Sequence, residues 1–251
     1  MSIERKVSIV TGSARGIGRA CARALAERGH AVVLVDVLLP EMERTRAEIE
    51  ASGVPTLAYE ADVASHARAR EVVADVMQRW GRIDVLVNNA GRSAPKGILE
   101  ISEDEWDQTI DVNLKSCFNW IQASAPHMLA AGHGRIVSLS SLNAHSGGVT
   151  AAVSKFAYAA SKAGVIGLTR ALAKELGPSI LVNCVCPGLI KTDLVAKALM
   201  AEREQELVSG IALKRPGTPE DVAELIAFLA TSEPCYITGQ DITIDGMQWN
   251  R

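Results

Sequence analysis

Thr11-Gly12-Ser13-Ala14-Arg15-Gly16-Ile17-Gly18 is the stretch that decides the fold. It directly follows an apolar run, residues 7–10, and opens a segment with helical periodicity, residues 17–28. Glycines permit a tight turn and a close approach of the backbone, and a helix start offers unpaired N–H groups with a positive dipole end. The stretch therefore predicts a site for the pyrophosphate of a dinucleotide. The residues that we assign to it are Gly12, Ser13, Arg15, Gly16, Ile17 and Gly18.

Short apolar runs alternate with helical patterns along the whole chain. Near-continuous apolarity in short strands indicates burial on both faces, which is typical of a parallel sheet covered by helices. With right-handed crossovers this predicts an α/β fold, a Rossmann-type doubly wound parallel sheet in a single domain over residues 1–251. The predicted strands are 7–10, 31–35, 55–59, 83–87, 135–139, 180–185 and 242–244. The predicted helices are 17–28, 42–51, 67–80, 104–131, a helix ending at 176, and 220–230. Residues 190–213 are expected to be a helical segment that covers the substrate.

Composition narrows the class of protein. The chain has 251 residues, 48% hydrophobic and 22% charged, with a formal net charge of −3. A near-neutral, slightly acidic chain has no electrostatic attraction for nucleic acid or an anionic membrane. We find no apolar run of membrane-spanning length and no signal-peptide core, so we expect a cytoplasmic protein. Five dispersed cysteines without a metal-ligand spacing predict neither disulfides nor a metal site.

Asp36 follows the last glycine of the first stretch by about 20 residues, at the end of the second predicted strand. A carboxylate at this place can accept hydrogen bonds from the adenosine ribose, whereas a 2′-phosphate would meet like charge. We therefore predict NAD in preference to NADP. Arg15 favours NADP instead, because its guanidinium group could pair with a 2′-phosphate. An alternative role for Asp36 is to cap the following helix.

Tyr158 and Lys162 stand four residues apart in a predicted helix, so they share one face about a turn apart. A fixed ammonium group beside a phenol favours the phenolate, which makes the phenol a usable proton donor and acceptor. A surface pair could carry the same spacing. The other motifs of the chain favour the chemical interpretation.

The chain is similar to the short-chain dehydrogenase/reductase family over nearly its whole length. The family's motifs occur in its usual order. They are Thr11–Gly18, Asp62-Val63, Asn88-Asn89-Ala90-Gly91, Asn113, Ser140-Ser141, Tyr158 with Lys162, and Pro187-Gly188 followed by Thr192. The resemblance implies a hydride transfer between nicotinamide and a secondary alcohol or ketone, without a metal.

The resemblance also implies roles for single residues. Asp62 and Val63 would line the adenine pocket, and Asn89, Ala90 and Gly91 would pass beneath the cofactor. Ile190 and Thr192, after Pro187 and Gly188, would hold the nicotinamide carboxamide. Lys162 would contact the nicotinamide ribose, and the amide of Asn113 would interrupt its helix and help to hold a water chain to Lys162. Tyr158 would exchange the proton and Ser141 would donate a hydrogen bond to the reacting oxygen.

Two further assignments concern the substrate side. Ser141 matches the second of the family's paired serines, with Ser140 as the alternative. The spacing from Ser141 to Tyr158 exceeds the family's usual one, so a longer loop would border the substrate. We take Asn143, His145 and Phe156 as substrate contacts, the alternative being a water-facing His145.

The substrate itself stays open between two groups. Many relatives by motif reduce 3-oxoacyl groups on acyl carrier protein, but the expected docking positions for that acidic partner lack arginine here. We place a small polar sugar, polyol or hydroxy acid slightly ahead. A non-catalytic dinucleotide-binding protein is a distant alternative, and a methyltransferase would not need the Tyr-Lys pair. Family members usually pair long helices across two-fold axes, so we expect a homotetramer.

Overall fold

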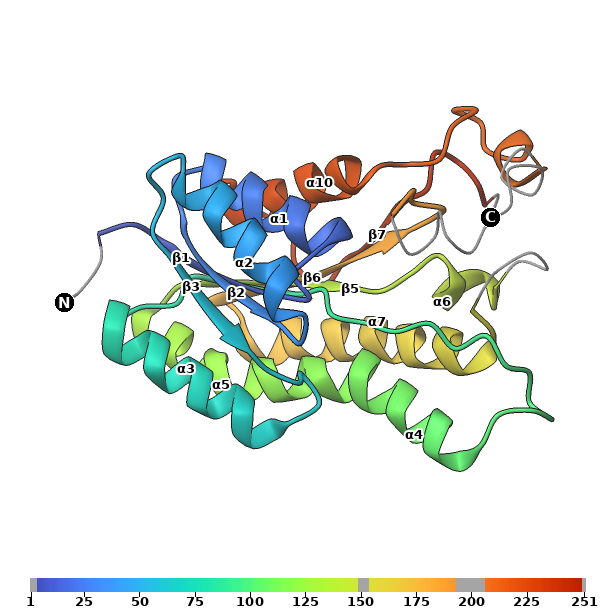
Figure 1. The fold of residues 1–251 in the computed structure, drawn as a ribbon, viewed down its shortest axis with the longest axis horizontal. Coiled ribbons are helices and arrows are strands. Elements are labelled where there is room, and N and C mark those ends of the chain that lie inside the picture. Colours follow the sequence, from blue (N-terminus) through green and yellow to red (C-terminus); the bar gives the residue numbers. More distant parts are fainter. Residues whose placement is uncertain (1–3, 149–153, 193–205, 250–251) are drawn as a thin grey trace.

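A seven-stranded parallel sheet lies between two layers of helices (Figure 1). The computed structural model describes residues 4–148, 154–192 and 206–249. The strand order is β3-β2-β1-β4-β5-β6-β7, and every neighbouring pair is parallel. The strands are β1 Val7–Thr11, β2 Ala31–Asp36, β3 Thr56–Glu60, β4 Val85–Asn88, β5 Gly134–Leu139, β6 Ile180–Pro187 and β7 Asp241–Ile244. This confirms the predicted doubly wound fold.

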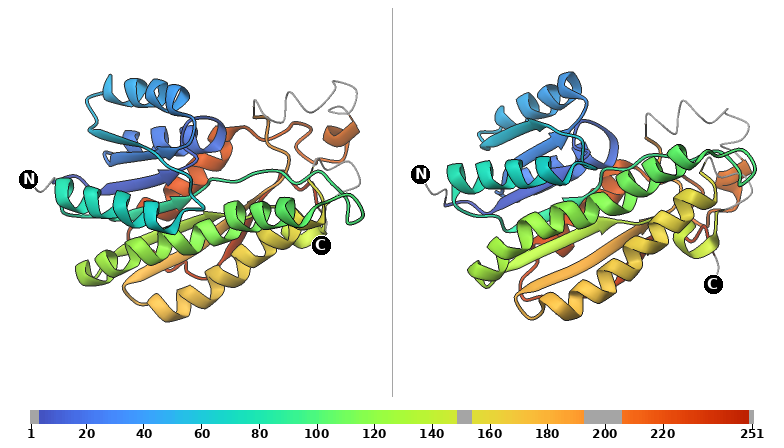
Figure 2. Two further views of the ribbon diagram at one scale, coloured as in Figure 1. Left: turned by 60° about the horizontal axis from the view of Figure 1, so that its bottom comes forward. Right: turned by 90° about the horizontal axis from the view of Figure 1, so that it is seen from below.

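The helices divide between the two faces of the sheet (Figures 1 and 2). One buried apolar cluster joins the sheet to α1, α2 and α10, and a second joins its other face to α3, α5 and α7. Strands such as β1 and β2 are buried along their whole length, as their apolar runs predicted. The helices are α1 Gly16–Glu27, α2 Leu39–Glu50, α3 His66–Trp80, α4 Glu103–Ile110, α5 Ser116–Ala131, α6 Asn143–Ser146, α7 Phe156–Leu176 and α10 Pro219–Thr231.

The long helix predicted over 104–131 is interrupted. A π-helical turn, η1 Asp111–Lys115, connects α4 to α5. Its central residue, Asn113, is fully buried and directs its amide inward to backbone and side-chain partners. Single π-turns inside α-helices often occur at functional sites. The interruption predicted at Asn113 is therefore present as a π-helical turn, and the chain stays helical from α4 through η1 to α5.

Strand order reverses at β1, which lies between β2 and β4. In open α/β sheets, ligands bind beyond the carboxyl ends of the strands at such a switch point. The segment 190–213, predicted to cover the substrate, is described only in part: 193–205 lies outside the described residues, and 206–209 is helical. Among the described residues, no helix has the length and apolarity needed to cross a bilayer. The five cysteines are free thiols.

Candidate active site

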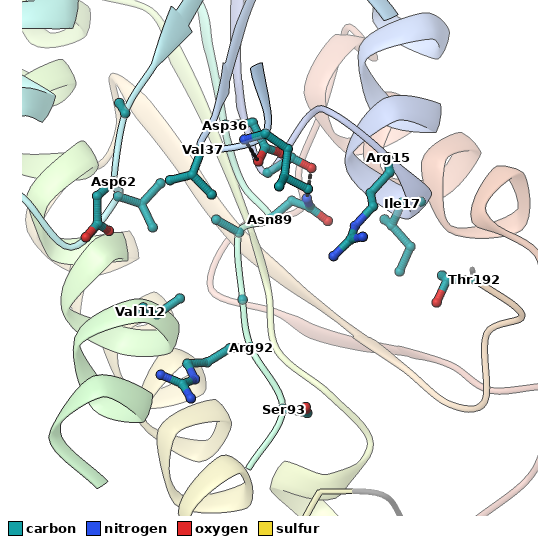
Figure 3. Close-up of a pocket in the computed structure, with 17 residues that line it drawn as sticks. Arg15, Ile17, Asp36, Val37, Asp62, Asn89, Arg92, Ser93, Val112 and Thr192 are labelled. Carbon is teal, nitrogen blue, oxygen red and sulfur yellow. Dashed lines mark hydrogen bonds between the residues drawn. The ribbon is translucent and has the colours of Figure 1, made fainter. Parts of the chain in front are cut away.

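A cavity of about 570 Å³ opens at the switch point, beyond the carboxyl ends of β1, β2 and β4 (Figure 3). Eleven of the residues predicted to bind the cofactor line it: Gly12, Arg15, Gly16, Ile17, Asp36, Asp62, Val63, Asn89, Ala90, Gly91 and Thr192. They come from segments far apart in the sequence, which supports the view that the motifs serve one ligand.

The glycine loop packs directly on the end of β4. A Cβ atom at Gly18 would lie 1.9 Å from the carbonyl oxygen of Gly12, so only glycine fits there. Gly12 has a φ of +65°, and Asn89 Nδ2 donates hydrogen bonds of 2.9 Å to the carbonyl oxygens of Thr11 and Gly12. α1 then begins at Gly16 without a side-chain cap. Its first N–H groups are thus available to an anion in the cavity, as a dinucleotide pyrophosphate requires.

Thr11 and Ser13 brace this loop. The Thr11 hydroxyl accepts hydrogen bonds from the backbone N–H groups of Asn89 and Ala90, at 3.0 and 3.2 Å. The Ser13 hydroxyl accepts from the N–H of Val35 at 2.9 Å and is fully buried. The side chain of Ser13, one of the predicted cofactor-binding residues, therefore ties the loop to β2.

Asp36 faces the cavity and also shapes its wall. One carboxylate oxygen accepts from the N–H of Ala14 at 2.9 Å, and the other from the N–H of Leu38 at 3.1 Å. Both predicted roles are thus compatible with its position, since each carboxylate oxygen can accept more than one hydrogen bond. Arg15 lines the same cavity and lies across from Asp36 (Figure 3).

The wall of the cavity formed by Asp62 and Val63 depends on a residue that was not predicted from the sequence. Asn119, fully buried on α5, donates from Nδ2 to the carbonyl oxygens of Val63 and Ala64, at 3.1 and 3.0 Å. It thereby fixes the turn that carries Asp62 and Val63. The available signal was an amide side chain between the aromatic residues Phe118 and Trp120. Further lining residues that the sequence did not indicate are Val37, Leu38, Ala61, Arg92, Ser93 and Val112.

Tyr158 and Lys162 lie one turn apart on α7, as predicted. The ammonium nitrogen of Lys162 is 5.7 Å from the centroid of the Tyr158 ring. It is buried and donates a 2.6 Å hydrogen bond to the carbonyl oxygen of Leu139, at the end of β5. Within the described part of the chain, the Tyr158 hydroxyl makes no hydrogen bond. A cation fixed beside a phenol that has a free hydroxyl is suited to proton exchange with a ligand.

Asn113 connects the cavity to α7. Its Oδ1 accepts from the N–H of Arg92 at 2.8 Å, and its Nδ2 donates to the carbonyl oxygen of Arg92 and to Ser161 Oγ. A Cβ atom at Gly91 would lie 3.2 Å from Asn113 Oδ1 and 3.6 Å from Lys162 Nζ. The amide is thus engaged by protein groups at the point where the helix is interrupted. The water chain to Lys162 stays a prediction.

The two candidate serines have different partners. Ser140 Oγ donates to the backbone carbonyl oxygen of Lys162 at 2.8 Å, which uses its only proton. Ser141 Oγ accepts from the N–H of Asn143 at 3.2 Å and keeps its proton for another acceptor. This geometry favours Ser141 as the hydrogen-bond donor to a substrate.

The predicted substrate contacts have aromatic partners of their own. The His145 ring stacks on Trp249, with centroids 5.5 Å apart, and Phe156 stacks on Trp106 at 5.7 Å. His145 Nε2 also lies 3.2 Å from a carboxylate oxygen of Asp241. His145 is therefore neither a water-facing loop residue nor an unengaged side chain.

The remaining predicted cofactor residues follow β6. Pro187 ends the strand, and the N–H of Gly188 donates to the carbonyl oxygen of Ile244 at 3.0 Å. Ile190 buries its side chain in the apolar cluster beside α10, so only its backbone can face the cavity. A Cβ atom at Gly16 would lie 3.5 Å from Thr192, so this segment reaches the glycine loop.

Comparisons with known proteins agree with this arrangement. A family model described as "Enoyl-(Acyl carrier protein) reductase" matches residues 12–246. A 3-oxoacyl-acyl-carrier-protein reductase of Thermotoga maritima is 42% identical over 247 residues, covering 98% of both chains. The (2S)-[(R)-hydroxy(phenyl)methyl]succinyl-CoA dehydrogenase subunit BbsD of Thauera aromatica is 40% identical, covering 98% of this chain and 97% of the relative.

A solved structure gives the same result. A short-chain dehydrogenase/reductase from Brucella melitensis, described as a glucose/ribitol dehydrogenase, superimposes with a TM-score of 0.88 at 32% identity, covering 100% of both chains. Most of the predicted cofactor residues line one cavity, and the similarity extends over the full length of the chain. The chain therefore belongs to the short-chain dehydrogenase/reductase family, and it is an oxidoreductase that acts on a CH–OH or carbonyl group with a nicotinamide cofactor.

Proposed function

We propose that the protein interconverts 3-oxoacyl and 3-hydroxyacyl thioesters, with NADH as the preferred reductant. The observation that carries the substrate class is the 42% and 40% full-length identity to two enzymes named for acyl-carrier-protein and CoA substrates. The small polar sugar, polyol or hydroxy acid that the sequence analysis placed slightly ahead has less support. It rests on similarity to one glucose/ribitol dehydrogenase at 32% identity.

The cavity residues fit a nicotinamide dinucleotide. The start of α1 has no side-chain cap, so its N–H groups can bind the pyrophosphate. The close contact between Gly18 and Gly12 lets the loop backbone approach the pyrophosphate. When bound, the cofactor supplies the hydride. Asp36 supports NAD because its carboxylate would repel a 2′-phosphate. Arg15 is the residue that would favour NADP instead.

The side chains of the chain would control the proton. Tyr158 would donate its hydroxyl proton to the oxygen that gains negative charge, and Lys162 would stabilise the phenolate left behind. Ser141 would donate a hydrogen bond to the same oxygen, in a position fixed before the reaction begins. Asn113 would act indirectly, by holding the backbone at Arg92 against α7.

A substrate panel tests the proposal. Acetoacetyl-CoA, acetoacetyl-acyl carrier protein, ribitol and glucose would each be assayed by nicotinamide absorbance with both cofactors. We expect thioester reduction to exceed polyol oxidation in kcat/KM by at least about tenfold, which corresponds to about 1.4 kcal/mol. Polyol oxidation without thioester reduction would contradict the substrate class. A higher kcat/KM with NADPH than with NADH would contradict the role of Asp36.

We also propose a cytoplasmic homotetramer. The apolar side chains Phe118 and Leu129 on α5 are each 44% exposed, which supports a helical interface between subunits. Light scattering after size-exclusion chromatography should give four times the mass of the chain. A monomeric mass would contradict the assembly.

A further inference from the structure

The C-terminal segment contacts the helix that follows the candidate catalytic serine. Trp249 lies close to the end of the chain, yet its ring stacks on His145 of α6 with an interplanar angle of 18°. The His145 side chain is only 15% exposed. Offset-stacked aromatic pairs stabilise a contact beyond the effect of the area that they bury. The stack thus supports a four-residue helix that has little stability of its own.

A second contact places His145 beside a carboxylate of the sheet, without a hydrogen bond to it. Its Nε2 lies 3.2 Å from Asp241 Oδ2, while Asp241 Oδ1 accepts a 2.7 Å hydrogen bond from Arg170 of α7. Asp241 is 12% exposed, whereas Arg170 is 60% exposed. β7 and the helix that bears Tyr158 and Lys162 are thereby connected to α6. We call His145, Asp241 and Trp249 the C-terminal clamp.

The clamp is itself anchored at two points near the nicotinamide side of the site. The N–H of Trp249 donates to Asp245 Oδ2 at 3.0 Å. The side-chain oxygen of Gln248 accepts from the N–H of Leu189 at 2.8 Å, in the segment between Gly188 and Ile190. These two hydrogen bonds therefore hold the segment that carries Trp249 in place beside α6.

The contacts continue from the clamp to Ser141. α6 begins at Asn143, whose N–H donates to Ser141 Oγ, and the N–H of Ala144 donates to the carbonyl oxygen of Ser141 at 3.0 Å. The orientation of the Ser141 hydroxyl thus depends on where α6 lies. We infer that Trp249 and His145 are positioning residues that hold α6 so that Ser141 directs its hydroxyl proton toward the substrate oxygen. This inference rests on the role of Ser141 in the proposed function.

A double-mutant cycle between Trp249 and Ser141 tests the inference. Trp249→Ala should lower kcat about tenfold, because a small displacement of a positioned group already costs a large factor in rate. The affinity for NADH should not change, since Trp249 is not among the residues that line the cavity. In the Ser141→Ala background, Trp249→Ala should cause no further loss, because the group that it positions is already absent. The same factor of loss in both backgrounds would overturn the inference.

Conservative variants serve as controls. Trp249→Phe retains a ring for the stack and should keep kcat within about twofold of the wild type. Tyr236→Ala removes a fully exposed aromatic residue and should have no effect. If Trp249→Ala does not fold, the cycle is run with His145→Ala, for which the same outcomes apply. An unchanged kcat in either folded variant would also overturn the inference.

The readout is independent of the thioester assignment. Each ratio is taken against the wild type on whichever carbonyl compound it reduces fastest. Failure of the thioester proposal would appear as a different best substrate in the panel, whereas failure of the clamp would appear as additivity in the cycle.

Discussion

Polar groups have different partners at the two edges of the parallel sheet, which are the amino edge, where the strands begin, and the carboxyl edge, where they end. At the amino edge, buried groups bind one another: Asp84 accepts from the N–H of Val7 at 2.7 Å and is held by Arg82, and Ser8 Oγ lies 2.7 Å from His30 Nδ1. At the carboxyl edge, α1 starts without a side-chain cap, and in the described part of the chain the Tyr158 hydroxyl has no hydrogen-bond partner.

This difference indicates that polar groups at the amino edge serve mainly stability and those at the carboxyl edge serve mainly function. Buried polar groups that are paired with each other stabilise the fold, because leaving either partner alone would carry a desolvation cost. Donors left available at a cavity are suited to a ligand instead. Substitutions at the carboxyl edge should therefore remove activity at little cost in stability, and substitutions at the amino edge should do the reverse.

The largest effect is expected at the carboxyl edge for Tyr158→Phe. Removing the hydroxyl eliminates the proposed proton donor, so kcat/KM should fall about a thousandfold. NADH binding and the unfolding temperature should stay close to those of the wild type, since the hydroxyl supports no other described residue. Steady-state kinetics with fluorescence titration of NADH would measure both. Activity within tenfold of the wild type would contradict the assigned role.

The next effect is expected for Gly18→Ala. The added methyl would lie 1.9 Å from the carbonyl oxygen of Gly12, so the loop must shift and the start of α1 must move away from the pyrophosphate. We expect the Kd for NADH to rise about a hundredfold, the equivalent of two charge-assisted hydrogen bonds. Gly167→Ala is the matched control, because a Cβ atom there meets no atom within 4 Å. Equal affinities in the two variants would refute the packing argument.

The smallest effect concerns the amino edge and appears in stability. Burial lowers the pKa of His30 from 6.5 to about 4, with Lys6, Arg82 and Arg28 adding to the shift and Asp84 opposing it. Below pH 6.5 the His30 imidazole is protonated in the unfolded chain, whereas in the folded protein it becomes protonated only near pH 4. The free energy of unfolding should therefore fall through this window by about 3 kcal/mol.

His30→Asn should remove that part of the pH dependence while leaving kcat unchanged. Urea unfolding at a series of pH values would measure it, with His127→Asn on α5 as the control. The same slope in wild type and His30→Asn between pH 6.5 and about 4 would show that His30 is not the titrating group.

The fold and the cofactor cavity could be predicted in detail because both depend on short-range constraints. Gly18 is required by a backbone contact within its own loop, Gly12 has a positive φ, and buried strands are visible in the sequence as apolar runs. The partners of Asn113 and Asn119 lie about 20 or more residues away in the sequence. The family resemblance indicated the interruption at Asn113, whereas the local sequence did not indicate which backbone groups Asn119 binds. The partners of His145 could not be predicted for the same reason, since Asp241 and Trp249 lie about 100 residues further along the chain.

Hydride transfer itself can be followed with a labelled cofactor. The protein would be given NADH carrying deuterium at both hydrogen positions of nicotinamide C4, together with acetoacetyl-CoA, and the product would be examined by mass spectrometry and NMR. The proposed function predicts deuterium on C3 of a 3-hydroxyacyl thioester, with formation of this product abolished in Tyr158→Phe. A product without the label, or labelled product formed at the wild-type rate by Tyr158→Phe, would contradict hydride transfer at a site organised by Tyr158.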